Sequence, residues 1–540
     1  MGSYRYLASL VALLALGGPI NTGRAAPSDW RTGFQPVRED CASRLSVLET
    51  TGWKPVVHDR QDACLPAKQT LLGEPPLLAA EPAPARRPNI VMLLIDDMGW
   101  GDFSCFGNTA AKTPNIDRIA AEGIRFEQFY VASPICSPSR VGLSTGQYPQ
   151  RWRITSFLNN RAENTARGMA QWLDPRAPML ARTLHDAGYA TGHFGKWHMG
   201  GQRDVGDAPL ITGYGFDASL TNFEGLGPRV LPLLDAHDGK PPRLYALGSD
   251  KLGHGEIIHQ DRSEVTATYS AAALAFIRKS AAAKQPFYVN LWPDDVHSPF
   301  FPPAALRGDA KKRTLYHAVL ATMDRQLGVL FDAIRADPAL RDNTLILICS
   351  DNGPEPGAGS AGIFRGGKGM LYEGGIRSPL IVWGPGFTNP QKVNSVNRRS
   401  VFSTIDIAPT LLEFAGVHPP DKVAFDGVPM RATLLGHSEA SRQPPLFFRR
   451  PPDRASVPGI PVLPDLAVRD GQWKFLCSYD GTSPQLYDLS ADPAETKDLA
   501  ASQPAEVARL SAAVVAWHRS LPADNGATYR AAKQADVSSP

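Results

Sequence analysis

Four apolar runs of strand length, separated by segments with helical periodicity, constrain the fold of this chain more than any other feature of its sequence. The first run, Asn89–Ile95, is uninterrupted, as expected of a strand that is buried on both faces of a sheet. Similar runs occupy residues 189–194, 287–292 and 344–349. Between the last two, apolar residues recur every three or four positions over residues 315–334, which indicates an amphipathic helix. This alternation predicts an α/β fold with a mostly parallel central sheet flanked by helices.

The first 25 residues have the pattern of an export signal. Arg5 precedes an apolar run over residues 7–16, and small residues precede a cleavage point after Ala25. Because a membrane-spanning helix needs roughly 20 apolar residues, we expect no transmembrane segment. The signal predicts an exported protein, periplasmic or extracellular. Residues 26–87, rich in proline and polar residues, are expected to form a poorly ordered leader and linker.

Two folded regions are expected after the leader: an α/β domain over residues 88–439 and a small α+β subdomain over residues 440–540. In the subdomain, strand-like runs on both sides of Asp470-Gly471 predict a hairpin. A further strand is predicted at 485–489 and a terminal helix at 506–521. The Arg-Arg-Pro-Pro run at 449–452 is interpreted as a solvated loop.

The charge balance and the cysteines exclude several classes of protein. Lys and Arg number 56 and Asp and Glu number 53, so the net charge of +3 gives no support for a nucleic-acid partner. The six cysteines are too few for a disulfide scaffold and show no CxxC spacing, which argues against structural zinc. Cys41 and Cys64 could form a disulfide, but nothing in the sequence fixes their geometry.

Polar side chains follow each of the four apolar runs. In an open α/β sheet, ligands bind outside the carboxyl ends of the strands. Any one of these residues could belong to a turn, but four strand ends with the same property indicate a functional site. The residues concerned are Asp96 and Asp97; Lys196 and His198; Asp294, Asp295 and His297; and Ser350, Asp351 and Asn352.

Asp96, Asp97, Asp351 and Asn352 supply only oxygen ligands. If they cluster without a cation, the three carboxylates repel one another and some stay protonated. Hard oxygen ligands suit Ca²⁺ or Mg²⁺ and not zinc. These residues therefore predict a site for a divalent cation.

Cys136 lies in a Gly, Ser and Pro-rich segment before a predicted helix, four residues ahead of Arg140. A thiol at a helix N-terminus beside an arginine has a lowered pKa and is reactive. A buried, inert thiol is the commoner fate of a free cysteine. Spacing alone leaves both interpretations open.

The segment CSPSR at residues 136–140 resembles the maturation signature CxPSR of the sulfatase family, within the alkaline-phosphatase-like superfamily, in which the cysteine is oxidised to Cα-formylglycine. The resemblance extends over about residues 88–500 and implies the alkaline-phosphatase-like fold. The other matching segments, in the family's order, are PNIVMLLIDDMGWGD (88–102), TPNIDRIAAEGIRF (113–126), GHFGKWHMG (192–200), CSDNG (349–353) and FRGGKGMLYEGGIRSP (364–379).

Carried over position by position, the resemblance assigns roles to individual residues. The implied cation is normally Ca²⁺, with Mg²⁺ as the alternative. The implied ligands are Asp96, Asp97, Asp351, Asn352 and the modified Cys136; Lys196 and Lys368 bind sulfate oxygens; His198 and His297 transfer protons; and Arg140 steadies the formylglycine hydrate.

The resemblance implies hydrolysis of an organic sulfate ester to an alcohol and inorganic sulfate, with a formylglycine-generating enzyme as maturation partner. The substrate is a sulfated small molecule or glycan, and export favours a sulfated carbohydrate. A phosphonate monoester or phosphodiester hydrolase of the same superfamily is the alternative. An inactive sulfated-glycan-binding paralogue ranks last, because every expected position is filled.

Overall fold

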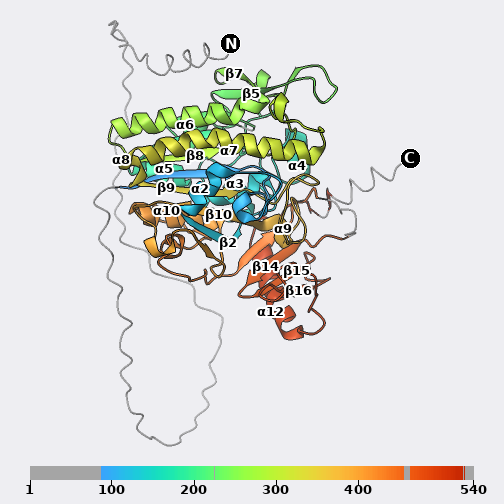
Figure 1. Ribbon diagram of the computed structural model, residues 1–540. Coiled ribbons are helices and arrows are strands. Elements are labelled where there is room, and N and C mark those ends of the chain that lie inside the picture. Colours follow the sequence, from blue (N-terminus) through green and yellow to red (C-terminus); the bar gives the residue numbers. More distant parts are fainter. Residues whose placement is uncertain (1–86, 224, 455–461, 527, 530–540) are drawn as a thin grey trace, which may run out of the picture. The chain divides into compact units, whose positions relative to one another are not determined.

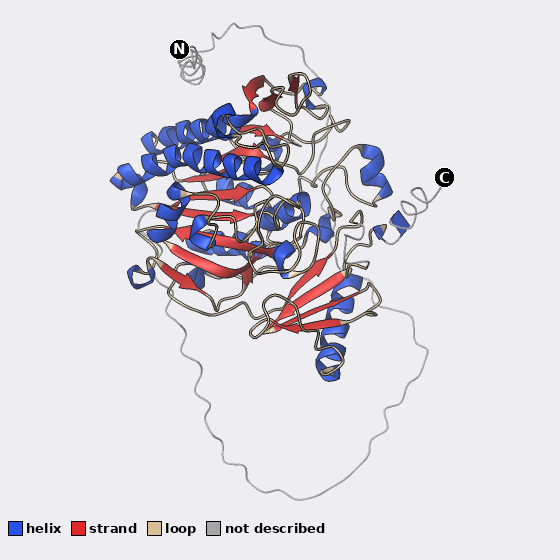
Figure 2. Ribbon diagram, turned by 45° about the vertical axis from the view of Figure 1, so that its right-hand side comes forward, coloured by secondary structure: helices blue, strands red, loops and turns tan. Residues whose placement is uncertain are grey.

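The computed structural model describes residues 87–223, 225–454, 462–526 and 528–529. The predicted signal peptide, the predicted leader up to residue 86, and both Cys41 and Cys64 lie outside the described residues. Helices cover both faces of a large sheet, and a smaller sheet follows it along the chain (Figures 1 and 2). Among the described residues, no helix is both long enough and apolar enough to cross a membrane.

The large sheet is mostly parallel, as predicted. Its strands in spatial order are β11 (Ser395–Asn397), β2 (Ile124–Tyr130), β10 (Arg377–Trp383), β9 (Thr344–Ser350), β1 (Asn89–Ile95), β8 (Phe287–Trp292), β3 (Ala190–Lys196), β4 (Ala218–Asn222), β5 (Arg229–Leu234) and β6 (Arg243–Leu244), with β12 (Phe402–Ser403) paired to β2 and β7 (Ile257–Asp261) paired to β5. The run from β9 to β5 is parallel throughout. The antiparallel pairs involve β10, which lies between β9 and β2, and β6.

Residues of β1 alternate between the two faces of this sheet, and both faces are covered. Val91 and Leu93 pack in one hydrophobic cluster, and Ile90 and Met92 pack in the other. This explains the uninterrupted apolar sequence of the strand. The helices of the first face are α2 (Pro114–Ala121), α6 (Val265–Ala282), α7 (Lys312–Ala336) and α8 (Pro338–Arg341); those of the second are α3 (Cys136–Thr145), α5 (Leu180–Asp186), α10 (Ile407–Ala415) and α11 (Arg431–Leu434).

The carboxyl ends of four neighbouring strands meet at one edge of the sheet. Ile95, the last residue of β1, is in register with Ser350 of β9. Gly195 of β3 is in register with Trp292 at the end of β8, and β8 in turn pairs with β1. The polar residues that follow these strands are therefore delivered to a common edge.

The smaller sheet is antiparallel. Its strands are β13 (Leu446–Arg449), β14 (Leu466–Asp470), β15 (Trp473–Cys477) and β16 (Gln485–Asp488), and α12 (Pro504–Arg519) packs against them. The predicted hairpin is present, but its loop is displaced by one residue, because Asp470 pairs with Trp473 and leaves Gly471-Gln472 as the loop. Gly471 has a φ of 54°, which glycine adopts without steric cost.

The interpretation of residues 449–452 as a solvated loop is wrong. Arg449 is 1% exposed and Arg450 is 5% exposed. Arg449 donates two hydrogen bonds to the carbonyl of Pro522, and Arg450 Nη2 lies 2.6 Å from Asp465 Oδ1. A guanidinium has five donors and can satisfy several buried acceptors, so arginines that look solvated in a sequence can lie in the interior.

Buried charges join the smaller sheet to the segment before β10. Lys474 Nζ of β15 lies 3.0 Å from Glu373 Oε1 and 3.3 Å from Glu495 Oε1, and all three side chains are fully buried. Glu373 opens α9 (Glu373–Ile376). Burial raises the pKa of Glu495 to about 7. Burial also acts to raise the pKa of Glu373, but the charges of Lys474 and Arg377 outweigh it and lower that pKa.

Candidate active site

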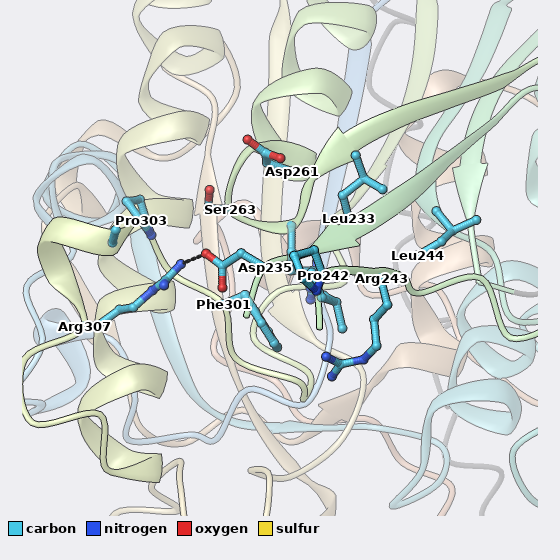
Figure 3. Close-up of a pocket in the computed structure, with 13 residues that line it drawn as sticks. Leu233, Asp235, Pro242, Arg243, Leu244, Asp261, Ser263, Phe301, Pro303 and Arg307 are labelled. Atoms are coloured by element: carbon cyan, nitrogen blue, oxygen red, sulfur yellow. Dashed lines mark hydrogen bonds and ion pairs between the residues drawn. The ribbon is translucent and has the colours of Figure 1, made fainter. Parts of the chain in front are cut away.

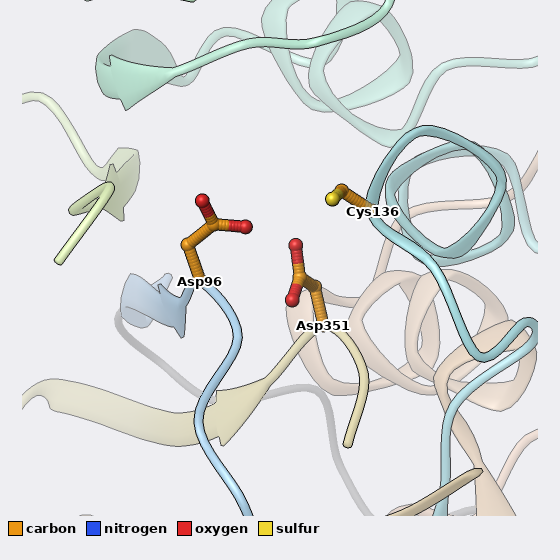
Figure 4. Close-up of side chains that lie close together, drawn as sticks. All are labelled: Asp96, Cys136 and Asp351. Atoms are coloured by element: carbon orange, nitrogen blue, oxygen red, sulfur yellow. The ribbon is translucent and has the colours of Figure 1, made fainter. Parts of the chain in front are cut away.

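Asp96, Cys136 and Asp351 point into a common space at the carboxyl edge of the large sheet (Figure 4). One ligand atom from each lies within 4.8 Å of the other two. Asp96 follows β1, Asp351 follows β9, and Cys136 is the first residue of α3. None of the three side chains is more than 2% exposed. Three elements that are distant in sequence thus place two carboxylates and a thiol together.

Asp97 and Asn352 complete the predicted oxygen set. Asn352 Nδ2 donates to Asp97 Oδ1 at 2.8 Å, and the backbone N–H of Asp97 donates to Asp351 Oδ1 at 3.2 Å. Asn352 Oδ1 is buried and accepts no hydrogen bond from the described residues. Asp97 has a φ of 57°, in the left-handed region, where Asp is among the more tolerant residues.

Arg140 lies against two of the carboxylates and is fully buried. Its Nη2 is 2.6 Å from Asp351 Oδ2 and 3.1 Å from Asp96 Oδ1. Its Nη1 donates to the carbonyl oxygen of Lys196 at 2.9 Å. The guanidinium therefore balances charge in the acidic cluster, and its predicted action on a formylglycine hydrate stays a prediction.

Two lysines face the same carboxylates. Lys196 Nζ, at the end of β3, is 2.6 Å from Asp96 Oδ2, and Lys368 Nζ pairs with Asp97 Oδ2. Lys368 lies in the long loop between β9 and α9. Burial acts to lower the pKa of both lysines, but the neighbouring carboxylates outweigh it and raise both values, so both lysines are cationic.

Two imidazoles complete the predicted set, one half-buried at His297 and one buried at His198. His297 Nδ1 lies 2.5 Å from the carbonyl oxygen of Ser298 and donates to it, which leaves Nε2, 3.5 Å from Asp97 Oδ2, without a proton in the neutral ring. Burial and the charge of Lys368 lower the pKa of His297 to about 4. His198 is buried with no hydrogen-bond partner on either ring nitrogen among the described residues.

The acidic cluster fits a divalent cation. Burial and the charge of Asp96 raise the pKa of Asp351 to about 7 in spite of Arg140. Burial acts to raise the pKa of Asp97 too, but Lys368 outweighs it and lowers that value to about 2. Arg140, Lys196 and Lys368 pair with the three carboxylates, and Asn352 adds a buried amide oxygen that accepts no hydrogen bond from the described residues. This donor set is the one that Ca²⁺ and Mg²⁺ prefer.

The thiol of Cys136 does not have a lowered pKa. Burial raises the pKa of this thiol to about 12 and outweighs the charges of Lys196 and Lys368. The guanidinium of Arg140 is directed to the carboxylates, so the helix N-terminus alone does not offset the loss of solvent. Of the two interpretations that the sequence leaves open, the structure favours the buried, inert thiol.

Residues 88–417 match the family model described as Sulfatase. The chain belongs to the sulfatase family. It is therefore a sulfuric ester hydrolase, as the sequence motifs predict. Residues 359–513 also match the family model described as N-sulphoglucosamine sulphohydrolase, C-terminal.

Comparisons with known proteins support this membership of the sulfatase family. The N-acetylgalactosamine-6-sulfatase of Sus scrofa is 34% identical over 377 residues, which cover 67% of this chain and 68% of the relative. Arylsulfatase A of Homo sapiens is 31% identical over 472 residues, or 78% of this chain and 85% of the relative. The crystal structure of Ps i-CgsB aligns with a TM-score of 0.65 at 26% identity and covers 80% of this chain and 93% of that chain. Ps i-CgsB has also been solved in complex with k-i-k-neocarrahexaose. The predicted alkaline-phosphatase-like fold class is confirmed.

Two further side chains, which no sequence motif marks, border the site of this sulfatase. Glu355 lies 3.8 Å from Lys368 Nζ, and burial together with the charge of Asp97 raises its pKa to about 7. The Phe223 ring lies 5.2 Å from the His198 ring and 4.6 Å from Lys196 Nζ. Glu355 stands three residues after Asn352, a spacing that could have drawn attention to it. Nothing in the sequence around Phe223 marks it.

The loop that carries Lys368 in this sulfatase is held on both sides of this lysine by one residue of the C-terminal region. Arg365 Nη1 donates to the carbonyl oxygen of Glu495 at 3.2 Å. The backbone N–H of Glu373 donates to Glu495 Oε2 at 2.7 Å. The position of Lys368 therefore depends on a segment that follows the smaller sheet.

Proposed function

We propose that this sulfatase hydrolyses sulfate esters of carbohydrates at the cluster around Asp96, Cys136 and Asp351. The observation that carries the proposal is the meeting of this cluster with two lysines and two histidines at one sheet edge. The carboxylates can bind a divalent cation, and the lysines around them can bind an anionic ester.

A sulfate monoester carries a negative charge that repels nucleophiles, and we assign Lys196 and Lys368 to binding its oxygens. Both are buried, where the attraction between an ammonium group and a sulfate is stronger than in water. Ca²⁺ or Mg²⁺, held by the three aspartates and Asn352, supplies further positive charge next to the sulfate group.

His297 is assigned as the group that gives a proton to the leaving alcohol. Its Nδ1 is committed to the carbonyl of Ser298, so the proton is carried on Nε2. Burial and the charge of Lys368 lower the pKa of His297, and the negative charge of a bound sulfate next to the ring acts in the opposite direction. His198, with both ring nitrogens free of partners among the described residues, is assigned to accept a proton on the nucleophile's side.

We propose that Cys136 acts after oxidation to formylglycine by a maturation enzyme. The unmodified thiol has a pKa of about 12 and is a poor nucleophile at neutral pH. Hydrated formylglycine supplies a hydroxyl nucleophile together with a second hydroxyl on the same carbon. The CxPSR match at 136–140 supports the modification, and the pattern of residues 1–25 supports export to the periplasm or the exterior.

A carbohydrate is the proposed substrate class because of the relatives. The Sus scrofa relative is an N-acetylgalactosamine-6-sulfatase by name, and Ps i-CgsB has been solved with k-i-k-neocarrahexaose. The proposed substrate is a sulfated sugar, either free or within a glycan.

The proposal predicts sulfate release from sulfated sugars or glycans. The protein should be exported from a host that forms formylglycine, with the modification at Cys136 confirmed by peptide mass. Sulfate is then measured by ion chromatography over a panel of sulfated polysaccharides, sulfated monosaccharides and aryl sulfates, with Cys136→Ala as the control. No release by fully converted protein would contradict the proposal, and phenyl phosphonates and phosphodiesters are the next panel.

The cation assignment predicts a stabilising effect of metal. Adding Ca²⁺ to metal-stripped protein at a hundredfold excess over its Kd should stabilise the folded state by about 2.7 kcal/mol and raise Tm. The effect should be largely lost in Asp351→Asn, which removes one buried carboxylate of the cluster. A Tm that neither Ca²⁺ nor Mg²⁺ changes would contradict a cation site, whatever the activity of the protein.

A further inference from the structure

A groove of about 630 Å³ is lined by residues of both sheets, and the proposed reaction does not use it. Arg377 of β10 and Arg469 of β14 form part of its lining. Both are buried and committed to neighbours: Arg377 Nε donates to the Glu127 carbonyl at 2.6 Å, and Arg469 Nη2 donates to Gln128 Oε1 at 3.2 Å. They fix the shape of the groove.

Two further arginines in the lining are open to solvent. The side chains of Arg398 and Arg399 are 68% and 83% exposed. Arg398 Nε lies 3.3 Å from Glu127 Oε1, and Arg399 Nη1 lies 3.7 Å from Glu439 Oε2. Exposed pairs of this kind contribute little, so an anionic ligand can replace these carboxylates. Among the described residues that line the groove, Glu127 is the only acidic one, against four arginines.

Apolar side chains form another part of the lining. The rings of Trp100 and Phe364 meet edge to face with centroids 4.9 Å apart, and Ile363 is 66% exposed beside them. Trp100 belongs to the loop that carries Asp97, and Phe364 belongs to the loop that carries Lys368. The groove therefore shares two loops with the proposed active site.

A second cavity, of about 600 Å³, has a different charge distribution (Figure 3). There Arg307 points to Asp235 and pairs with it, and Arg243 pairs with Asp238. Asp261 adds a further acidic side chain to that lining. The two cavities are similar in volume, but the described lining of the second holds three arginines and two aspartates, against four arginines and one glutamate in the groove.

We propose that the groove lined by Trp100, Phe364, Arg398 and Arg399 is an accessory binding site for a sulfated oligosaccharide, an inference that rests on the proposed carbohydrate function. The planar guanidinium group donates paired N–H···O hydrogen bonds to two oxygens of one oxyanion, which suits sulfate groups spaced along a glycan. Aromatic and aliphatic side chains offer surfaces for the apolar faces of sugar rings. The site holds a chain of substrate beside the loops of the catalytic centre.

The test is binding of a chondroitin 6-sulfate hexasaccharide to full-length protein that carries Cys136→Ala, so that the probe is not hydrolysed. Calorimetry should give about tenfold weaker affinity after Arg398→Ser/Arg399→Ser. The matched control is Arg243→Ser/Arg307→Ser, which removes two arginines from the second cavity and should leave the affinity unchanged. Unsulfated chondroitin hexasaccharide should bind at least tenfold more weakly than the sulfated probe.

Equal affinity with and without Arg398 and Arg399, or an equal loss in the matched control, would overturn the proposal. Failure of the hexasaccharide to bind at all would overturn it too. With Cys136 intact, Arg398→Ser/Arg399→Ser should hydrolyse 4-nitrophenyl sulfate at the rate of the parent protein. Absence of sulfate release by the parent over the whole ester panel would count against the proposed function, whereas the difference in affinity between Arg398→Ser/Arg399→Ser and its matched control reports on the groove.

Discussion

Cys136→Ser is expected to reduce sustained sulfate release by more than about a thousandfold, the scale on which loss of a nucleophile acts in other hydrolases. Serine has one hydroxyl and no second one from which a bound sulfate could be expelled, so this variant should release at most one equivalent of alcohol. Cys136→Ala should release none. The measurement is sulfate and alcohol release over many turnovers, with each variant checked for folding by its unfolding transition.

Cys105→Ser is the matched control for this experiment. Cys105 is a free, half-buried cysteine outside the cluster, and its exchange for serine should leave activity unchanged. Sustained turnover by Cys136→Ser would exclude formylglycine as the nucleophile. In that case Cys136 would be a buried structural cysteine and not the precursor of the nucleophile.

Lys474→Met is expected to lower the free energy of unfolding by about 3–5 kcal/mol, because it leaves Glu373 and Glu495 buried without their shared cation. The pKa of Glu495 is already raised to about 7, above its value in the unfolded chain, so its ionisation weakens the folded state as pH rises. Without Lys474 both carboxylates bind protons more strongly in the folded state. The loss in free energy of unfolding caused by Lys474→Met should therefore be larger at about pH 8 than at about pH 5. Urea unfolding at both pH values measures it.

Lys392→Met provides the matched comparison. Lys392 pairs with Glu439 at 2.8 Å, and both side chains are more than 40% exposed, so its loss should cost no more than about 1 kcal/mol. The expectation is contradicted if Lys474→Met loses as little free energy of unfolding as Lys392→Met, or if its loss shrinks as pH rises. Either result would show that other groups stabilise the two buried carboxylates.

The sequence permitted prediction of the parallel sheet and of the edge where the polar residues gather. Apolar runs such as Asn89–Ile95 indicate strands buried on both faces, and parallel strands end at the same edge. Asp96 and Asp351 were therefore predicted together from pattern alone, although more than 250 residues separate them in the chain.

Other features of the site depend on loop conformation and on burial, and neither produces a periodic pattern of apolar residues in the sequence. Lys368 follows no strand, so only the resemblance of its segment to the sulfatase family placed it in the site. Its partner Glu355 and the neighbour Phe223 carry no such signature. The sequence leaves the direction of the Cys136 pKa shift open, because proximity to arginine is visible in a sequence whereas loss of solvent is not.

The anchoring of the Lys368 loop by Glu495 has a consequence for biosynthesis. A ribosome produces every residue proposed for catalysis before it reaches position 495, yet the hydrogen bonds that fix the loop at Arg365 and Glu373 are still missing at that moment. We therefore expect the Lys368 loop to reach its final position only after the C-terminal region has been translated and folded. A truncation just ahead of Glu495 would retain every residue proposed for catalysis, and we expect it to release sulfate more slowly than the full chain because these two hydrogen bonds are lost.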